Sequence, residues 1–188
     1  MTMNNKFLNA IYDFSSVLLT AILAVSVIFT FGFKISAVIG DSMKETLHNG
    51  DNVVISAVTS NIKYGDVVVI SQPNGYEKVL IKRVIAVGGQ TVRFDRLSGK
   101  VVVDGVALDE PYIRANMIFT ASMNNTYTVP EGCLFVMGDN RNESADSRDK
   151  NVGFIDERYV VGKVIYKFGD KQLFNSDFEE SKNEQEDL

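Results

Sequence analysis

The pattern of hydrophobic and polar positions divides the chain into two parts. From Phe14 to Phe33 the sequence is uncharged and mostly apolar, and Asp13 and Lys34 bound this run. A helix of about 20 residues is roughly 30 Å long, which is the hydrocarbon thickness of a bilayer. We therefore predict a transmembrane helix over residues 14–33, preceded by a short N-terminal segment, 1–13.

A cleaved signal peptide and a buried core helix are the alternatives for this run. A signal peptide has a shorter apolar core, of about 7–15 residues, followed by small residues at a cleavage site. Here the bulky sequence Phe31-Gly32-Phe33-Lys34 follows instead, which favours an uncleaved anchor. The charge rule indicates orientation only weakly, because Asp13 counters Lys6 and Lys34 lies on the far side.

After Lys34 the chain changes to short β-rich runs separated by turn residues. The predicted strands are 52–58, 66–71, 79–87, 100–103, 106–108, 126–129, 133–137 and 159–168. Asp104-Gly105 predicts a two-residue hairpin turn, because this pair tolerates positive φ. No long 3.6-residue periodicity separates the runs, so we predict a mainly β, antiparallel domain over residues 36–175.

Two segments of the chain stand apart from the main sheet. Residues 93–127 have the pattern of a hairpin excursion. Residues 176–188 are dominated by Asp, Glu, Asn and Lys and contain too few apolar side chains to form a core. We expect this acidic tail to be disordered.

Composition excludes several classes of protein and site. The 188 residues carry a net charge of -5 and no basic stripe, which argues against a nucleic-acid partner. The single cysteine, Cys133, allows no intrachain disulfide and fits a buried apolar position in a strand. The single histidine, His48, would have to serve any Ser-His-Asp triad, but its polar turn is typical of a surface histidine. No cluster has metal-ligand spacing, so we predict neither a metal nor a cofactor.

A serine nucleophile without histidine needs another base, and a neutral lysine can act as one. Burial can lower the lysine pKa from about 10.4, so a lysine in an apolar strand is the candidate. Lys82 lies in such a run, where alternation places Leu80, Lys82 and Val84 on one face and Ile81, Arg83 and Ile85 on the other. An outward-pointing lysine on an edge strand is the alternative, and composition alone favours it.

The polar run from Asp139 to Arg148 follows a strand and Gly138 directly. One interpretation is a solvated loop with a surface pair of Asp146 and Arg148. The other is a supporting loop, in which a hydroxyl orients the lysine amine and an ion pair holds the loop in place.

Several blocks of the sequence together resemble the bacterial type I signal peptidases (leader peptidases) of the Gram-positive type, which are membrane-anchored Ser/Lys-dyad endopeptidases with a β-rich, partly open barrel ectodomain. The matching blocks are Gly40-Asp41-Ser42-Met43 with Thr46-Leu47, Tyr64-Gly65-Asp66-Val67-Val68-Val69, Lys82-Arg83-Val84-Ile85 with Gly88-Gly89, and Gly138 to Arg148. Each block is weak alone, but the ordered set behind an apolar anchor is specific.

The resemblance implies roles for the matching residues. Ser42 would attack the scissile carbonyl, and Lys82 would take its proton and later protonate the leaving amine. The Ser42 backbone N–H would be one oxyanion donor. Gly40 stands where some members have a serine hydroxyl as the second donor. Ser144 matches the hydroxyl that hydrogen-bonds the lysine, Asp146 and Arg148 match a supporting ion pair, and Asp139 matches a nearby structural carboxylate.

The resemblance also implies the substrate and the location. Members cut exported preproteins after signal peptides that have small side chains at the first and third positions before the bond. The candidate linings of the substrate pockets are Val38, Ile39, Met43, Leu80 and Ile81, each of which fits core packing equally well. The N-terminus would be cytoplasmic and the catalytic domain extracytoplasmic, beside the lipid bilayer.

One position departs from the family pattern. The nucleophile block of the family usually reads Ser-Met-x-Pro-Thr-Leu, and Glu45 here replaces the proline and its fixed φ. Two alternatives stay open. A self-cleaving Ser/Lys repressor-type peptidase shares the dyad, although the 14–33 run argues against it. A non-catalytic or accessory membrane-anchored β-domain that binds a cell-surface partner is the other.

Overall fold

The computed structural model describes residues 2–71, 76, 78–119, 125–168 and 172–173. The chain divides into two compact units, Met1–Lys34 and Ile35–Leu188. The boundary lies close to the predicted start of the β domain at residue 36. The predicted acidic tail, 176–188, lies outside the described residues.

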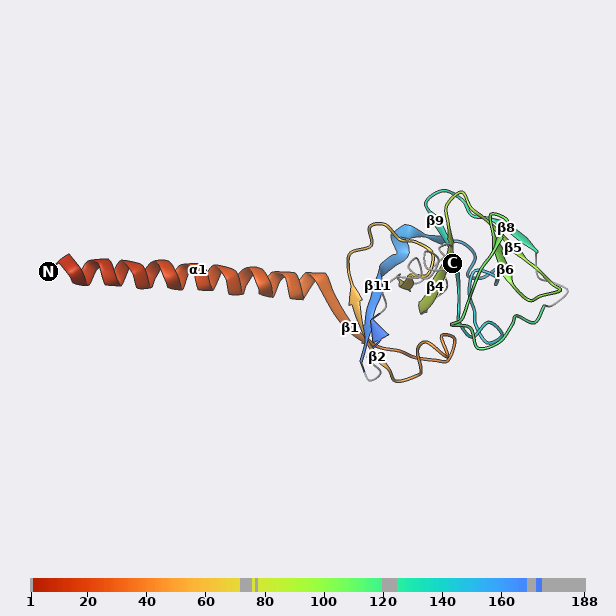
Figure 1. The fold of residues 1–188 in the computed structure, drawn as a ribbon, viewed down its shortest axis with the longest axis horizontal. Coiled ribbons are helices and arrows are strands. Elements are labelled where there is room, and N and C mark those ends of the chain that lie inside the picture. The colour runs from red at the N-terminus through yellow and green to blue at the C-terminus, as the bar shows by residue number, and fades with distance from the viewer. Residues whose placement is uncertain (1, 72–75, 77, 120–124, 169–171, 174–188) are drawn as a thin grey trace, which may run out of the picture. The chain divides into compact units, whose positions relative to one another are not determined.

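The first unit is dominated by one helix, α1 (Thr2–Gly32) (Figure 1). Residues 2–13 belong to this helix, which is therefore longer than the apolar run predicted. The part from Phe7 to Gly32 has a mean hydropathy of 2.3, so α1 is long and apolar enough to cross a membrane. Its large apolar side chains are exposed all round, which is typical of a helix whose solvent is lipid.

The second unit is built on an eight-stranded sheet with the order β1-β2-β11-β3-β4-β9-β10, and β12 pairs with β11. Its strands are β1 (Phe33–Ala37), β2 (Asn52–Ser56), β3 (Val67–Ser71), β4 (Val79–Val87), β9 (Cys133–Met137), β10 (Ile155–Asp156), β11 (Val160–Lys167) and β12 (Gln172–Leu173). The pairings from β2 to β10 are antiparallel, and the sheet curls into a half-barrel (Figure 1). The predicted mainly β, antiparallel, partly open barrel is confirmed.

A second, four-stranded sheet with the order β7-β6-β5-β8 corresponds to the predicted excursion. Its strands are β5 (Thr91–Phe94), β6 (Val101–Val103), β7 (Val106–Ala107) and β8 (Thr126–Thr128). The hairpin turn is where the sequence predicts it, since Asp104 and Gly105 both have positive φ, of 50° and 88°. The excursion is thus a small sheet of its own and not a single hairpin.

The core covers both faces of the central strands β3 and β4. Leu80 and Val84 pack with Val68 in one cluster, whereas Ile81 packs with Val67 in another. This confirms the predicted alternation as far as Val84. A register shift against β9 follows, and Ile85 lies in a third cluster, under the second sheet. β4 is therefore an interior strand between β3 and β9, which contradicts an edge position for Lys82.

Replacing Phe135 by alanine should strongly destabilise the second unit. Its ring is fully buried and touches the rings of Phe94, Tyr127 and Phe154. We expect Phe135→Ala to lower the free energy of unfolding by about 3–5 kcal/mol, measured by urea denaturation. Leu97→Ala is the control, because Leu97 is 100% exposed, and should change it by less than about 0.5 kcal/mol. Equal losses in both variants would contradict this assignment of the core.

Candidate active site

Backbone hydrogen bonds join the two ends of the loop that carries Ser42, and buried side chains anchor the loop in the core. Val38 N donates to Asp51 O at 2.8 Å, and Gly50 N donates to Val38 O at 2.9 Å. Within the loop, the buried side chains of Met43 and Leu47 pack in the core. Ser42 itself is half-buried. We call residues 38–51 the nucleophile turn.

Lys82 extends from the middle of β4. Across the sheet it pairs with Val68, which belongs to the same apolar cluster as Leu80 and Val84. The Lys82 side chain therefore starts on a fully apolar face, and only 3% of the residue is exposed.

The Lys82 amine meets the Ser42 hydroxyl. A hydrogen bond joins Lys82 Nζ to Ser42 Oγ at 2.6 Å, and a second joins Nζ to Ile81 O at 2.9 Å. Burial lowers the pKa of Lys82 to about 8, although the negative charges of Asp146 and Asp139 oppose this shift. An amine within hydrogen-bond reach and with a pKa near 8 is suited to take a proton from the hydroxyl.

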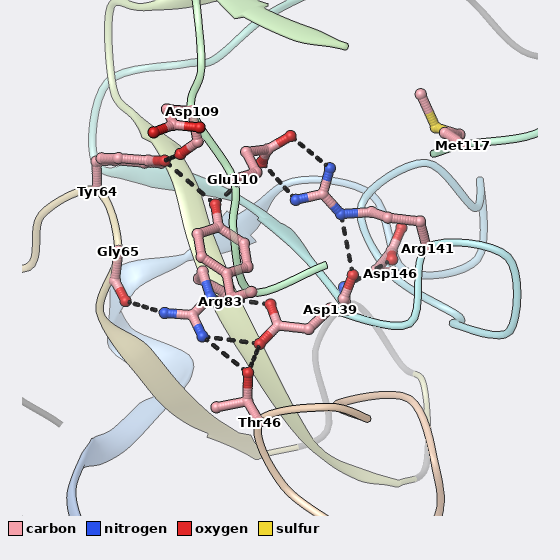
Figure 2. A network of polar contacts seen from close by, with 12 residues as sticks. Thr46, Tyr64, Gly65, Arg83, Asp109, Glu110, Met117, Asp139, Arg141 and Asp146 are labelled. Carbon is pink, nitrogen blue, oxygen red and sulfur yellow. Dashed lines mark hydrogen bonds and ion pairs between the residues drawn. The ribbon is translucent and has the colours of Figure 1, made fainter. Parts of the chain in front are cut away.

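Arg83, the next residue of β4, points to the other face and enters a buried ion pair with Asp139. Arg83 Nε and Nη2 donate to the two Asp139 oxygens at 2.9 and 2.7 Å, and Arg83 Nη1 donates to Gly65 O at 2.8 Å (Figure 2). Thr46 Oγ1 of the nucleophile turn donates to Asp139 as well. Asp139, predicted as a structural carboxylate, thus links the strand of Lys82 to the turn of Ser42.

Asp146 and Arg148 also form their predicted ion pair. Arg148 Nε and Nη2 donate to the two Asp146 oxygens, each at 2.7 Å, and Gly138 N donates to Asp146 Oδ2 at 2.9 Å. The Asp146 side chain is fully buried, so the pair is not the solvated surface contact that the sequence left open. It fixes the start and the end of the 138–148 loop to each other.

Ser144 lies beside the site without the hydrogen bond that the resemblance implies. Its Oγ is buried and has no hydrogen-bond partner within the described part of the chain. The bonds of Lys82 Nζ go to Ser42 and Ile81 instead. Close approach here requires Gly138, because a Cβ at that position would lie 2.3 Å from Ser144 Oγ and 2.5 Å from Ser42 O.

Gly40 contributes no second oxyanion donor in this structure. It lacks a side-chain hydroxyl, and its N–H donates to Asn49 Oδ1 at 2.9 Å. Its φ of +94° is in the left-handed region that favours glycine. Gly40 therefore shapes the entry to the nucleophile turn.

The five candidate pocket residues do not lie together. Val38, Met43 and Ile81 share one apolar cluster, whereas Leu80 lies in another, on the opposite face of β4. Ile39, next to the nucleophile turn's closing bonds, is 91% exposed. Only Ile39 therefore presents most of its side chain to an incoming ligand.

Glu45 and His48 both lie on the surface of the nucleophile turn. Glu45 Oε1 is 3.8 Å from Arg114 Nε, with both side chains more than half exposed. His48 Nδ1 is 3.8 Å from Asp51 Oδ2. The hydrogen bonds of the Lys82 amine go to Ser42 and Ile81.

A third buried ion pair, Arg141 with Glu110, was missed by the sequence reasoning. Arg141 Nη1 and Nη2 each donate to one Glu110 carboxylate oxygen, and Arg141 Nε donates to Gly138 O at 3.2 Å (Figure 2). Tyr112, also missed, donates to Glu110 Oε1 at 3.0 Å. The only signal was a run of charged and aromatic residues at 109–114, between predicted strands, where no pattern indicates burial.

No group of three or more His, Cys, Asp or Glu side chains is placed to hold a metal ion among the residues that the structure describes.

Comparison with known proteins identifies the family. The profile described as signal peptidase, peptidase S26, matches residues 11–168. Probable signal peptidase I-1 of Synechocystis sp. is 37% identical over 138 residues, which cover 68% of this chain and 67% of the relative. Signal peptidase I of Bacillus licheniformis is 31% identical, over 85% of this chain and 89% of the relative. Signal peptidase IB of Staphylococcus aureus is 34% identical, over 77% and 83%.

Among solved structures, a signal peptidase I from Enterococcus faecalis is similar with a TM-score of 0.45 and 27% identity, covering 56% of this chain and 97% of that one. The family match spans both the apolar helix and the strands around Ser42 and Lys82. The chain therefore belongs to the signal peptidase family, peptidase S26.

Proposed function

We propose that this signal peptidase is a membrane-anchored serine endopeptidase that removes N-terminal signal peptides from exported preproteins, with Ser42 as nucleophile and Lys82 as general base. The observation that carries the proposal is the 2.6 Å contact between Ser42 Oγ and Lys82 Nζ, made by a lysine that is almost fully buried. A buried amine of lowered pKa is the form of lysine that accepts a proton.

The reaction follows from this pair. Ser42 Oγ attacks the scissile carbonyl while its proton passes to Lys82 Nζ. The resulting ammonium protonates the leaving amine, and the peptide bond breaks to give an acyl-enzyme ester on Ser42. Lys82, neutral again, takes a proton from a water molecule that hydrolyses the ester. The Ser42 backbone N–H would donate to the oxyanion in both steps.

The supporting residues hold Ser42 and Lys82 close to each other. Asp139 ties β4 to the nucleophile turn through Arg83 and Thr46, and the Asp146–Arg148 pair closes the 138–148 loop. Their charges also act on the base, because Asp146 and Asp139 raise the Lys82 pKa and Arg148 lowers it. Ser144 is a further candidate, since its buried hydroxyl has no hydrogen-bond partner in the described part of the chain and lies next to Gly138.

Substrates would be signal peptides with small side chains at the first and third positions before the bond. Of the candidate linings, Val38, Met43 and Ile81 pack together in one apolar core cluster, and Ile39 is exposed. Leu80 packs in a different apolar cluster, on the same face of β4 as Lys82, and is 8% exposed.

The apolar helix would anchor the enzyme in the membrane with the N-terminus in the cytoplasm and the catalytic unit outside. The hydropathy of Phe7–Gly32 and its exposed apolar side chains support a single span. Exported preproteins reach the extracytoplasmic surface of the membrane with the signal peptide still attached. An anchor next to the catalytic unit therefore raises the local concentration of substrate.

Substitution of either member of the pair should abolish cleavage. In detergent, with a peptide containing Ala-x-Ala before the cleaved bond, we expect Ser42→Ala and Lys82→Met each to lower kcat/KM by about 10³-fold or more. His48→Ala, which removes the single histidine, should stay within about twofold of wild type. Wild-type activity in Ser42→Ala or Lys82→Met protein would refute the dyad.

The pH dependence should report the buried lysine. Below its pKa of about 8, Lys82 is an ammonium ion and accepts no proton. We expect kcat/KM to fall about tenfold per pH unit below pH 8 and to level off above it, for a substrate that does not titrate in this range. A pH profile that changes in His48→Ala would point to the histidine instead.

The proposed topology predicts the outcome of protease treatment of intact cells. Protease added outside should degrade the β-rich unit, while cytoplasmic control proteins survive. A variant lacking residues 2–32 should no longer sediment with membranes after alkaline washing. Protection of the β-rich unit until the membrane is permeabilised would reverse the orientation.

A further inference from the structure

A segment that contributes no member of the Ser42–Lys82 pair lies against the elements that carry both. We call residues 109–118, which follow β7, the bracing segment. Glu110 binds Arg141 of the 138–148 loop, and Tyr64 OH donates to Asp109 O at 3.3 Å. Further along the segment, Ile118 N donates to Asn142 Oδ1 at 2.8 Å, Asn142 Nδ2 donates to Asn116 O at 3.1 Å, and Arg148 Nη1 lies 3.1 Å from Met117 Sδ.

Tyr112 is the residue of this segment that reaches β4. The Arg83 guanidinium carbon lies 3.9 Å from the centroid of the Tyr112 ring, so the cation is stacked on the aromatic face. At its other end, the Tyr112 hydroxyl donates to Glu110 Oε1 at 3.0 Å and lies 3.2 Å from Tyr64 OH. Figure 2 shows the two ion pairs, Arg83 with Asp139 and Arg141 with Glu110.

Arg83 is in a position to transmit this contact to the catalytic pair. It directly follows Lys82 on β4, and through Asp139 it is connected to Thr46 of the nucleophile turn. Asn140 N also donates to Ser42 O at 3.0 Å. Two parallel connections thus join β4 to the turn: the contact of Lys82 with Ser42, and the chain from Arg83 through Asp139 to Thr46.

We propose that Tyr112 is a positioning residue for catalysis, whose ring fixes the Arg83 guanidinium against Asp139 and thereby sets the distance between Ser42 and Lys82. The inference rests on the proposed function of that pair. Burial makes the contact effective, because Arg83 is 4% exposed and the side chains of Glu110 and Arg141 are almost fully buried. A flat aromatic face restrains the rotation of a planar guanidinium, which an aliphatic side chain does not.

The effect should lie in the chemical step and not in substrate affinity. A displacement of about 1 Å between reacting groups is enough to slow a reaction about 100-fold. Tyr112 touches Arg83 and Glu110, and it lies in none of the apolar clusters that contain Val38, Met43 or Ile81. Loss of its ring should therefore lower kcat and leave KM nearly unchanged.

The experiment compares two substitutions of Tyr112 in the full-length protein in detergent, with the Ala-x-Ala peptide as substrate. Tyr112→Leu removes the aromatic face, and we expect kcat to fall about 10- to 100-fold while KM stays within about twofold. Tyr112→Phe keeps the ring and loses only the hydroxyl, and it should restore kcat to within about threefold of wild type.

Tyr127→Leu is the matched control. Tyr127 is an aromatic residue of the second sheet whose ring packs against those of Phe94, Phe135 and Phe154. It should lower the Tm as Tyr112→Leu does and keep wild-type kcat. The inference is overturned if Tyr112→Leu keeps wild-type kcat, if Tyr112→Phe loses as much kcat as Tyr112→Leu, or if Tyr127→Leu loses as much.

Ser42→Ala in the same assay separates this inference from the proposed function. If Ser42→Ala is inactive while Tyr112→Leu matches wild type, only the positioning role fails. If Ser42→Ala cleaves the peptide as wild type does, the dyad fails, and the positioning role fails with it.

Discussion

The site depends on keeping water away from one amine while leaving the neighbouring hydroxyl accessible. Lys82 meets this requirement because β4 is an interior strand, covered on both faces by apolar clusters. The same burial that lowers its pKa would be costly for a charged side chain without partners. The nucleophile turn resolves the conflict by placing Ser42, half-buried, over the end of the lysine side chain.

Around this apolar centre, the charges of the site are arranged in pairs. In each pair the two side chains are buried and two hydrogen bonds join them. The pairs are Arg83 with Asp139, Arg141 with Glu110 and Arg148 with Asp146. Buried ion pairs contribute little net stability, because desolvation offsets their attraction, but they fix geometry strongly. Here they join β4, the nucleophile turn and the 138–148 loop, which are far apart in the sequence. They hold these separate chain segments in fixed positions relative to one another.

Most strands of the main sheet were accessible from the sequence because they follow local rules. Alternation from Leu80 to Val84 and the Asp104-Gly105 turn both depend on neighbours in the chain, and both are found in the structure. Some strands escaped prediction: β1 has every residue exposed, β10 and β12 have two residues each, and β5 has four. Such strands are specified by their partners in the sheet and not by their own pattern.

Long-range polar contacts were the part of the site that the sequence concealed. Glu110 and Tyr112 have no periodic pattern around them, and their burial depends on Arg141 and Arg83, which come from other elements. For the Ser144 hydroxyl, the sequence implied a hydrogen bond that the described part of the structure does not contain. The sequence block implies a bond to the lysine, but in the structure the amine already has Ser42 and Ile81 as partners. Residue type indicates which groups gather, whereas packing decides which of them bond.

Lys82 and Arg83 are consecutive, so β4 presents the amine on one face and the guanidinium on the other. Gain or loss of one residue before this point in β4 would exchange the two side chains between faces, placing the guanidinium in the apolar cluster and the amine beside Asp139. Length changes in β4 should therefore be excluded during evolution of this chain. Insertions beside Leu97, which is fully exposed at the hairpin tip, should be tolerated better than insertions in β4.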